Sequence, residues 1–146
     1  MKLRIAWIGK TKEAAIQSLT AEYLKRLARY TPTEGNEFSS EAALLKQLDK
    51  TGRTVPVFVA LDSRGTEMSS EQLAEFLRGQ QDRGIQELIF AIGPADGWST
   101  AALKLAQHKL SLGRMTLPHE LARVVLVEQL YRGFTILKGH PYHTGH

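Results

Sequence analysis

Apolar and polar side chains alternate over the first residues of the chain and then recur at helical spacing. The alternation over Lys2–Ile8 predicts a first β-strand, which Gly9 ends. One face of the following helix is marked by Ile16, Leu19, Tyr23 and Leu27. We expect this helix to run to about Tyr30, because proline disfavours helical geometry in the residue before it and Thr31-Pro32 comes next.

The next stretch predicts a second strand, a short helix and a third strand. Thr33–Phe38 reads as a weak strand, and Ser39 or Ser40 can cap the helix that follows it. The apolar face expected for that helix consists of Ala42, Leu45 and Leu48. Val55–Leu61 is a nearly continuous apolar run, which is typical of a strand that is covered on both faces.

A capping box opens the middle of the chain. Ser69 followed by Gln72 has this form, because the serine can accept from a backbone amide while the glutamine reaches back. The residues expected to face inward on the helix are Leu73, Phe76 and Leu77. Leu88–Ile92 predicts another buried strand, and the loop Gly93–Gly97 follows it.

The last third predicts a helix, a short strand and a long helix. Ser99 can cap a helix that we expect to reach about Leu110. Arg114–Leu117 reads as a short strand, and Pro118 leads into a long helix. The apolar side expected for that helix consists of Leu121, Val124, Val125, Leu130 and Tyr131. The tail Lys138–His146 has too little apolar content to fold alone.

Strands that alternate with helices predict an α/β fold, a parallel sheet with helices on both faces, in one domain spanning residues 1–146. Ligands of such sheets bind at the carboxyl ends of strands. Three places qualify: the segment after Leu61, the loop Gly93–Gly97, and the region around Arg114–Pro118. We therefore expect three loops to converge on one small molecule.

Composition narrows the class of protein. The chain has no cysteine, so disulfides, thiol nucleophiles and thiolate metal sites are excluded. Its longest apolar run is far shorter than a membrane span, and Lys10 and Lys12 interrupt any signal-peptide pattern. The simplest expectation is a cytoplasmic protein with no membrane partner.

Charge is unevenly placed, although the net value is only +4. Acidic and basic side chains balance over residues 1–97. The basic residues after that point are Lys104, Lys109, Arg114, Arg123, Arg132 and Lys138, against Glu120 and Glu128. All five histidines also lie there. This pattern fits a polyanionic partner such as nucleic acid, although scattered charge on a surface would look the same.

Several other chemistries find little support. His119-Glu120 begins like a zinc-protease motif, but Arg123 stands where the second histidine is needed. The tail histidines lack neighbouring carboxylates, so we expect no metal. There is no Gly-x-Ser-x-Gly elbow for a hydrolase. Trp7 is expected in the core.

Two segments leave alternatives open. The loop Gly93–Gly97 is either a plain turn between strand and helix or a place where the backbone approaches a ligand. The tail His140–His143 is either a fraying end or a functional element. Its tyrosine could stack on a base, and a histidine could exchange a proton near neutral pH.

The residues of the last third resemble the RlmH family, which belongs to the SPOUT class of RNA methyltransferases. The resemblance is carried by Met115–His119, by Leu121 and Arg123, by Glu128–Arg132 and by His140–His143, in this order and at this spacing. It is strongest over the last two-fifths of the chain. Earlier segments agree in their order.

The resemblance implies a SPOUT fold whose carboxyl-terminal segment forms a trefoil knot. It also implies a homodimer with the active site near the subunit interface. The implied reaction is methyl transfer from S-adenosyl-L-methionine to N3 of a pseudouridine in 23S ribosomal RNA, within the assembled ribosome. The alternatives are another RNA, such as tRNA, or a ribosome-binding factor without catalysis.

Carried onto this chain, the resemblance assigns a cofactor site and a catalytic group. The cofactor residues would be Leu61, Gly93, Pro94, Gly97, Leu112, Gly113, Arg114, Met115, Thr116, Leu117 and Pro118. Pro94 stands where the family has a second glycine, so a backbone donor is missing there. Tyr142 and His143 would position and deprotonate the target base, and Arg132 would hold a phosphate or the uracil oxygen. Glu128 either orients Arg132 or is a surface charge.

Overall fold

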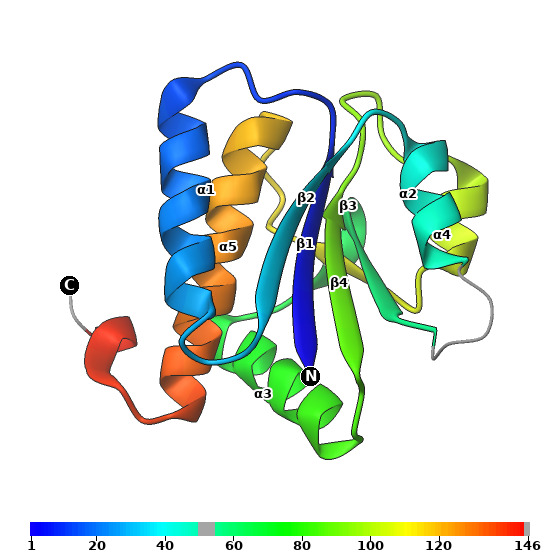
Figure 1. The fold of residues 1–146 in the computed structure, drawn as a ribbon. Coiled ribbons are helices and arrows are strands. Elements are labelled where there is room, and N and C mark those ends of the chain that lie inside the picture. Colours follow the sequence, from blue (N-terminus) through cyan, green and yellow to red (C-terminus); the bar gives the residue numbers. More distant parts are fainter. Residues whose placement is uncertain (50–54, 145–146) are drawn as a thin grey trace.

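A parallel sheet forms the centre of the computed structural model, which describes residues 1–49 and 55–144 (Figure 1). Its strands are β1 (Lys2–Ile8), β2 (Thr33–Phe38), β3 (Val57–Glu67), β4 (Glu87–Ile92) and β5 (His108–Ser111). They lie in the order β2-β1-β4-β3-β5, and every neighbouring pair is parallel. The expected α/β fold with a parallel sheet is confirmed.

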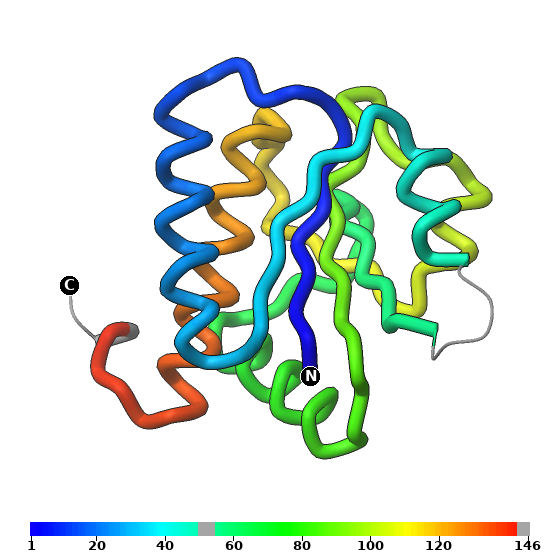
Figure 2. The backbone as a smooth tube through the Cα atoms, in the orientation of Figure 1, coloured from blue at the N-terminus to red at the C-terminus, as the bar shows by residue number. Residues whose placement is uncertain are grey.

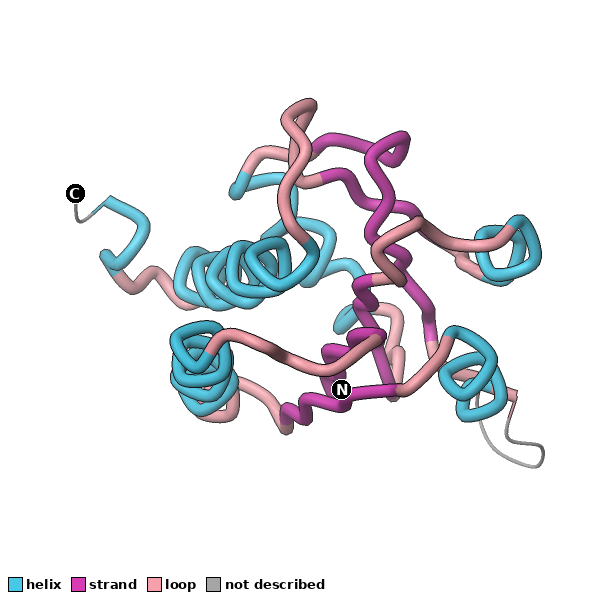
Figure 3. Tube along the Cα trace, turned by 90° about the horizontal axis from the view of Figure 1, so that it is seen from above, coloured by secondary structure: helices cyan, strands magenta, loops and turns pink. Residues whose placement is uncertain are grey.

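Helices cover both faces of this sheet, as the alternating pattern predicts. They are α1 (Ala14–Leu27), α2 (Glu41–Leu48), α3 (Ser70–Asp82), α4 (Thr100–Leu105) and α5 (His119–Leu137), followed by the 3₁₀ helix η1 (Pro141–Thr144). α1, α3 and α5 lie on one face, and α2 and α4 on the other (Figure 3). Figure 2 traces the chain from the base of β1 to η1, which lies beside the far end of α5.

Each face has its own apolar core, because successive side chains of a strand point to opposite sides. Leu3, Ile5 and Trp7 of β1 join the core beneath α1, α3 and α5, so Trp7 is a core residue as expected. Ala6 and Ile8 join the smaller core beneath α2 and α4. The sheet is therefore buried on both sides, which agrees with its apolar strands.

Serine caps fix the starts of three helices. Ser40 accepts from the Ala43 amide and Ser99 from the Ala102 amide. Ser69 and Gln72 form the reciprocal capping box that their spacing predicts. These starts were predictable because a cap needs only a side chain and an amide that are three residues apart.

The strand expected at Arg114–Leu117 is wrong, and the helix expected to reach about Leu110 ends at Leu105. The edge strand β5 lies between these two positions. Gln107 explains the change. Its backbone amide donates to the Phe58 carbonyl, and its side-chain oxygen accepts from the Phe58 backbone amide. Both bonds attach the chain to β3 just before β5 begins.

Two apolar faces also differ from the prediction. On α2, Leu44 is buried while Ala42 is exposed. On α5, Leu121 is 43% exposed, and the buried residues include Leu126, Val127 and Phe134. α5 packs between α1 and α3. Because it is covered on more than one side, its sequence shows no clear periodicity.

The limits of β3 differ as well. Val55 is 67% exposed and lies outside the strand, which begins at Val57 and continues to Glu67.

No helix in the described ranges is long and apolar enough to cross a membrane. The trefoil knot stays a prediction.

Candidate cofactor cavity and tail cluster

A cavity of about 640 Å³ opens at the carboxyl ends of three adjacent strands, β4, β3 and β5. Its walls come from residues 61–63, 92–95, 97–98, 110–113 and 115–119, together with Ala122 in the first turn of α5. These are the three loops that the strand-end argument selects. The third loop follows β5 at His108–Ser111 and not a strand at Arg114–Leu117. The position of this loop was therefore predicted correctly, although the strand assigned to it was wrong.

A break in the pairing of β3 with β5 shapes one wall. Leu61 and Thr66 both pair with Leu110, so the residues between them loop out of the ladder. Gly65 makes this possible, because a Cβ there would lie 2.6 Å from the backbone of Lys109. Asp62 and Ser63 of the looped-out segment line the cavity, and they are among its polar groups.

Trp98 links two of the loops. Its Nε1 donates to the Leu61 carbonyl oxygen at 2.9 Å, and its ring packs edge-on against Phe58. A Cβ on Gly93 would lie 2.7 Å from the Trp98 ring. Glycine is therefore required here to admit the tryptophan, which sequence analysis did not assign to the site.

The segment Pro94–Gly97 forms a tight turn. The Gly97 amide donates to the Pro94 carbonyl at 2.8 Å, and Gly97 has a φ of +92°. Pro94 has no amide hydrogen, but its ring and carbonyl belong to this turn at the cavity wall. The proline thus changes the donors available to a ligand while the loop itself remains ordered by its own hydrogen bond.

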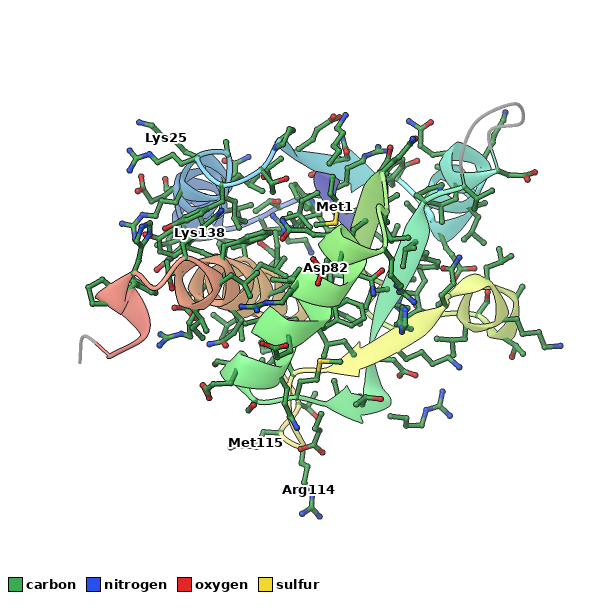
Figure 4. The ribbon with its side chains drawn as sticks, turned by 90° about the horizontal axis from the view of Figure 1, so that it is seen from below. Met1, Lys25, Asp82, Arg114, Met115 and Lys138 are labelled. Carbon is green, nitrogen blue, oxygen red and sulfur yellow. The ribbon has the colours of Figure 1, made fainter. Side chains whose placement is uncertain are left out.

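Ten of the eleven residues expected to bind the cofactor line this cavity. They are Leu61, Gly93, Pro94, Gly97, Leu112, Gly113, Met115, Thr116, Leu117 and Pro118. Arg114 does not line it, and its side chain points away from the body of the molecule (Figure 4). Met115 is 86% exposed beside it, so the cavity has an apolar side chain at its open edge.

The tail carries a second polar cluster. Glu128 Oε2 accepts from Arg132 at 2.8 Å and from the Tyr142 hydroxyl at 2.9 Å. Its other oxygen accepts from Gln129, which in turn accepts from Ser70 of α3. Two residues with expected catalytic roles are thus held by one carboxylate, so of the two readings of Glu128 the geometry favours the orienting one.

All four tyrosines of the chain gather around this cluster. The Tyr142 ring lies edge-on to Tyr131 at 4.7 Å, and its hydroxyl contacts that of Tyr23 at 3.4 Å. Tyr30 contacts His140 Nδ1 at 2.5 Å. The tail segment up to Tyr142 is therefore docked onto α1 and α5, which favours a functional element over a fraying end.

The environment of Tyr142 favours its neutral form. Burial is the main cause that raises the pKa of its hydroxyl, and the hydrogen bonds with Tyr23 and Glu128 raise it further. The pKa of Arg132 is also raised, chiefly by its hydrogen bond to Glu128, so its guanidinium stays charged. The His143 side chain, the other expected proton acceptor, lies outside the described residues.

Arg123 is buried, although sequence analysis counted it among the basic residues of the last third. It is 1% exposed, its guanidinium lies 4.1 Å from the centre of the Trp7 ring, and it donates to Thr11 at 2.7 Å. Burial lowers its pKa. Arg123 therefore belongs to the core and not to a surface for a polyanion.

Glu120 was also missed by sequence analysis. Its carboxylate accepts from the amides of Lys12 and Glu13, at the start of α1. α1 has no side-chain cap of its own, so a residue of α5 satisfies these amides across the fold.

Within residues 1–49 and 55–144, no group of three or more His, Asp or Glu side chains could hold a metal ion.

The cavity and the tail cluster lie at different positions along α5. His119 begins the helix at the cavity, whereas Glu128 and Arg132 of the tail cluster lie nine and thirteen residues further along. At 1.5 Å per residue they are roughly 14 Å and 20 Å from His119. The tail cluster is therefore separate from the cavity of its own chain.

Comparisons with known proteins agree with the expected family. Residues 1–143 match the family model described as "Predicted SPOUT methyltransferase". The chain is 66% identical, over the full length of both sequences, to a ribosomal RNA large subunit methyltransferase H of Koribacter versatilis. A protein of the same name from Geobacter sp. strain M21 is 41% identical, over 98% of this chain and 99% of its own length.

A solved structure supports the fold alone. It is described as a probable methylase family protein from Haemophilus influenzae Rd KW20, with a TM-score of 0.61 and 12% sequence identity. The match covers 96% of this chain and 69% of the other. From the family model and the two full-length relatives, the chain belongs to the SPOUT methyltransferases, and within them to the RlmH family.

Proposed function

We propose that this protein is an S-adenosyl-L-methionine-dependent methyltransferase that acts on ribosomal RNA of the large subunit. The observation that carries the proposal is the cavity at the ends of β3, β4 and β5, lined by ten residues that the family resemblance had assigned to the cofactor. The names of relatives that match the whole chain agree with it.

The cavity fits the proposed cofactor in size and chemistry. Its volume of about 640 Å³ lies within the range of pockets for molecules of this size. Leu61, Leu112, Leu117 and Trp98 offer apolar surface, and Asp62 offers a carboxylate for a cationic group. We assign the cofactor to this cavity, where Gly93 admits the Trp98 ring to the wall and Gly113, with no atom within 4 Å of its Cβ position, leaves room for close approach.

The finer proposal is methylation of N3 of a pseudouridine in 23S ribosomal RNA, on the assembled ribosome. S-adenosyl-L-methionine supplies an activated methyl group when bound. The residues of the chain must then align the base, accept the N3 proton and stabilise the negative charge that develops on the ring. Because ribosomes would be the substrate, we place the protein in the cytoplasm.

The tail cluster suggests how these tasks are divided. Tyr142 is held neutral and donates to Glu128, so we assign it to positioning the base rather than to accepting a proton. Arg132 keeps its charge and is 29% exposed, so it is suited to hold a phosphate or a uracil oxygen. His143 is then the tail residue that we propose as the proton acceptor, on the family resemblance.

We propose a homodimer, on the family resemblance and because the tail cluster is separate from the cavity of its own chain. Arg132 lies roughly 20 Å from His119 along α5, and Glu128, which holds Tyr142, roughly 14 Å. In a dimer, the tail of one copy would meet the cavity of the other. Met115 and Leu121, 86% and 43% exposed next to the cavity, give a second copy apolar surface to cover.

The direct test is methyl transfer from labelled S-adenosyl-L-methionine to bacterial ribosomes that lack the modification, followed by mass spectrometry of the 23S RNA. We expect one new methyl group on a pseudouridine, and its loss in the variants Arg132→Ala and His143→Ala. Methylation of tRNA instead would favour the other-RNA alternative. Ribosome binding with no methyl transfer and no cofactor affinity would favour a non-catalytic binding factor.

The dimer is tested by co-expressing two inactive variants. Gly93→Leu would obstruct the cavity and Arg132→Ala would disable the tail, so each homodimer should be inactive. If each site combines two copies, a random mixture should regain about a quarter of the normal activity, because half of the dimers contain one intact site. No recovery, with mixed dimers present, would contradict a shared site.

A further inference from the structure

The end of α1 carries exposed cations next to the docked tail. Lys25 lies in the last turn of α1 and Arg29 four residues later, and both are exposed. Lys138 caps the end of α5 and is exposed as well. Figure 4 shows Lys25 and Lys138 on the same side of the molecule. We call Lys25, Arg29 and Lys138 the α1–α5 cation group.

Packing contacts show that the two helix ends meet. Tyr30, which follows Arg29, lines a hollow of about 300 Å³ together with Lys138. The same tyrosine stacks on Phe134 of α5 and contacts His140 of the tail. Arg29, next to Tyr30, and Lys138 are thus brought to the same end of the molecule, and Lys25 lies in the last turn of α1 before them.

These three cations have no carboxylate partner among the ion pairs of the described residues. Their neighbours differ. Arg26 is paired with Glu22 and lies over the rings of Tyr23 and Tyr131, and Arg132 is paired with Glu128. Asp82 of α3 lines the hollow together with Lys138, and so does Arg78.

We propose that the α1–α5 cation group binds the phosphate backbone of the RNA beside the target nucleotide. This inference rests on the proposed function, because the tail must reach the base. An RNA strand whose base lies at the tail passes next to Lys25, Arg29 and Lys138. Such contacts fix the position of the strand and carry no sequence information. They would also supply affinity for RNA from the methyltransferase domain itself.

The proposed RNA-binding residues differ from the basic residues that sequence analysis counted in the last third of the chain. Of the six basic residues there, Arg123 is buried, and Arg132 is paired. Lys104 and Lys109 lie on α4 and the edge strand β5, away from the tail. Lys25 of α1 and Arg29 just after this helix are two cations from a region whose charges balance along the sequence. The basic surface exists only in the folded chain.

The test compares two triple variants that lose the same charge. Lys25→Ala, Arg29→Ala and Lys138→Ala remove the α1–α5 cation group. The control replaces Lys46, Lys104 and Lys109 with alanine; all three are exposed, on α2, α4 and β5. Dissociation constants for ribosomes that lack the modification are measured at several salt concentrations, alongside cofactor affinity, thermal unfolding and methyl transfer at saturating ribosomes.

We expect the first variant to bind ribosomes more weakly, on the order of tenfold per lost phosphate contact at 0.1 M salt, and its salt dependence to fall by about one unit of slope per contact. Cofactor affinity, thermal unfolding and the rate at saturation should stay near those of the unmodified protein. The control, and a variant with Lys25→Arg, Arg29→Lys and Lys138→Arg, should retain binding.

Equal binding by the first variant and the unmodified protein would overturn the inference, and so would equal weakening in the control. Both outcomes leave the proposed function intact if the unmodified protein methylates ribosomes. Failure of the unmodified protein to methylate any RNA would instead count against the proposed function, whatever the binding data show.

Discussion

The Tyr142 hydroxyl donates to Glu128 Oε2, the same oxygen that accepts from Arg132. One carboxylate thus orients two residues that are expected to face the target base, one from α5 and one from the tail. Glu128 is only 18% exposed, so solvent screens these bonds less than it would at a surface. This atom links the tail to the helix, in addition to the packing of the Tyr142 ring on Tyr131 of α5.

Glu128→Gln should lower the rate of methyl transfer at saturating ribosomes by about 10- to 100-fold. This range corresponds to losing one hydrogen bond to a charged group, worth about 1.5–3 kcal/mol. Cofactor affinity should not change, because Glu128 does not line the cavity and lies nine residues along α5 from His119. The measurement is single-turnover methylation together with cofactor titration.

A matched control is Glu22→Gln, which removes an exposed carboxylate paired with an arginine at the same spacing on α1. We expect it to leave the rate at saturation near normal. If both variants slowed methylation alike, Glu128 would act only through its negative charge and not by orienting Arg132 and Tyr142.

Tyr142→Phe should slow methyl transfer without moving the pH at which the rate falls on the acidic side. The folded protein raises the pKa of this hydroxyl, so it is neutral throughout the range of activity and does not supply the proton-accepting group. Rates measured between about pH 6 and pH 9 test this, since a histidine titrates within that range. A lost or displaced acidic limb in this variant would assign the proton transfer to Tyr142.

The same residue should make stability depend on alkaline pH. A raised pKa in the folded state means that the neutral phenol favours folding, so its contribution is fully present below the unfolded pKa of about 10. It is lost as the pH rises from there toward the folded value. Urea denaturation at about pH 8 and about pH 11 should show a smaller difference between unmodified protein and Tyr142→Phe at the higher pH. A constant difference would contradict the raised pKa.

Sequence analysis predicted local structure well where a rule links nearby residues. The capping box at Ser69 and Gln72 and the alternation of Lys2–Ile8 needed no knowledge of distant contacts. The position of β5 was missed because it depends on Gln107 bonding to Phe58, which is 49 residues away. No periodicity reports such a contact.

The candidate site shows the same division. Its three loops were predictable, because the carboxyl ends of adjacent parallel strands meet at one edge. The cofactor residues were assigned from the family resemblance. Neither the strand-end argument nor the resemblance predicted Trp98, since only the fold places its ring against Gly93. Arg123 was counted with the basic residues, yet a linear sequence does not distinguish a buried cation from an exposed one.

Gly93→Ala should weaken both folding and cofactor binding. The added Cβ would lie 2.7 Å from the Trp98 ring and displace it, with its hydrogen bond to Leu61, from the cavity wall. Overpacking of this kind costs about 1–3 kcal/mol. Thermal unfolding and cofactor titration measure the two effects. Gly79→Ala is the control, because no atom lies within 4 Å of its Cβ position and it lies inside α3, so stability should rise slightly or stay unchanged.

Arg123→Ala should be among the most destabilising changes in the chain. It removes a side chain that is 1% exposed, with its contact to Trp7 and its hydrogen bond to Thr11, so we expect a loss of about 2–5 kcal/mol in the free energy of unfolding. Arg123→Met should cost less, since an unbranched apolar chain of similar length fills the same space. Urea denaturation compares the two. Unchanged stability in both variants, with weaker ribosome binding, would mean that Arg123 serves RNA directly and is not a core residue.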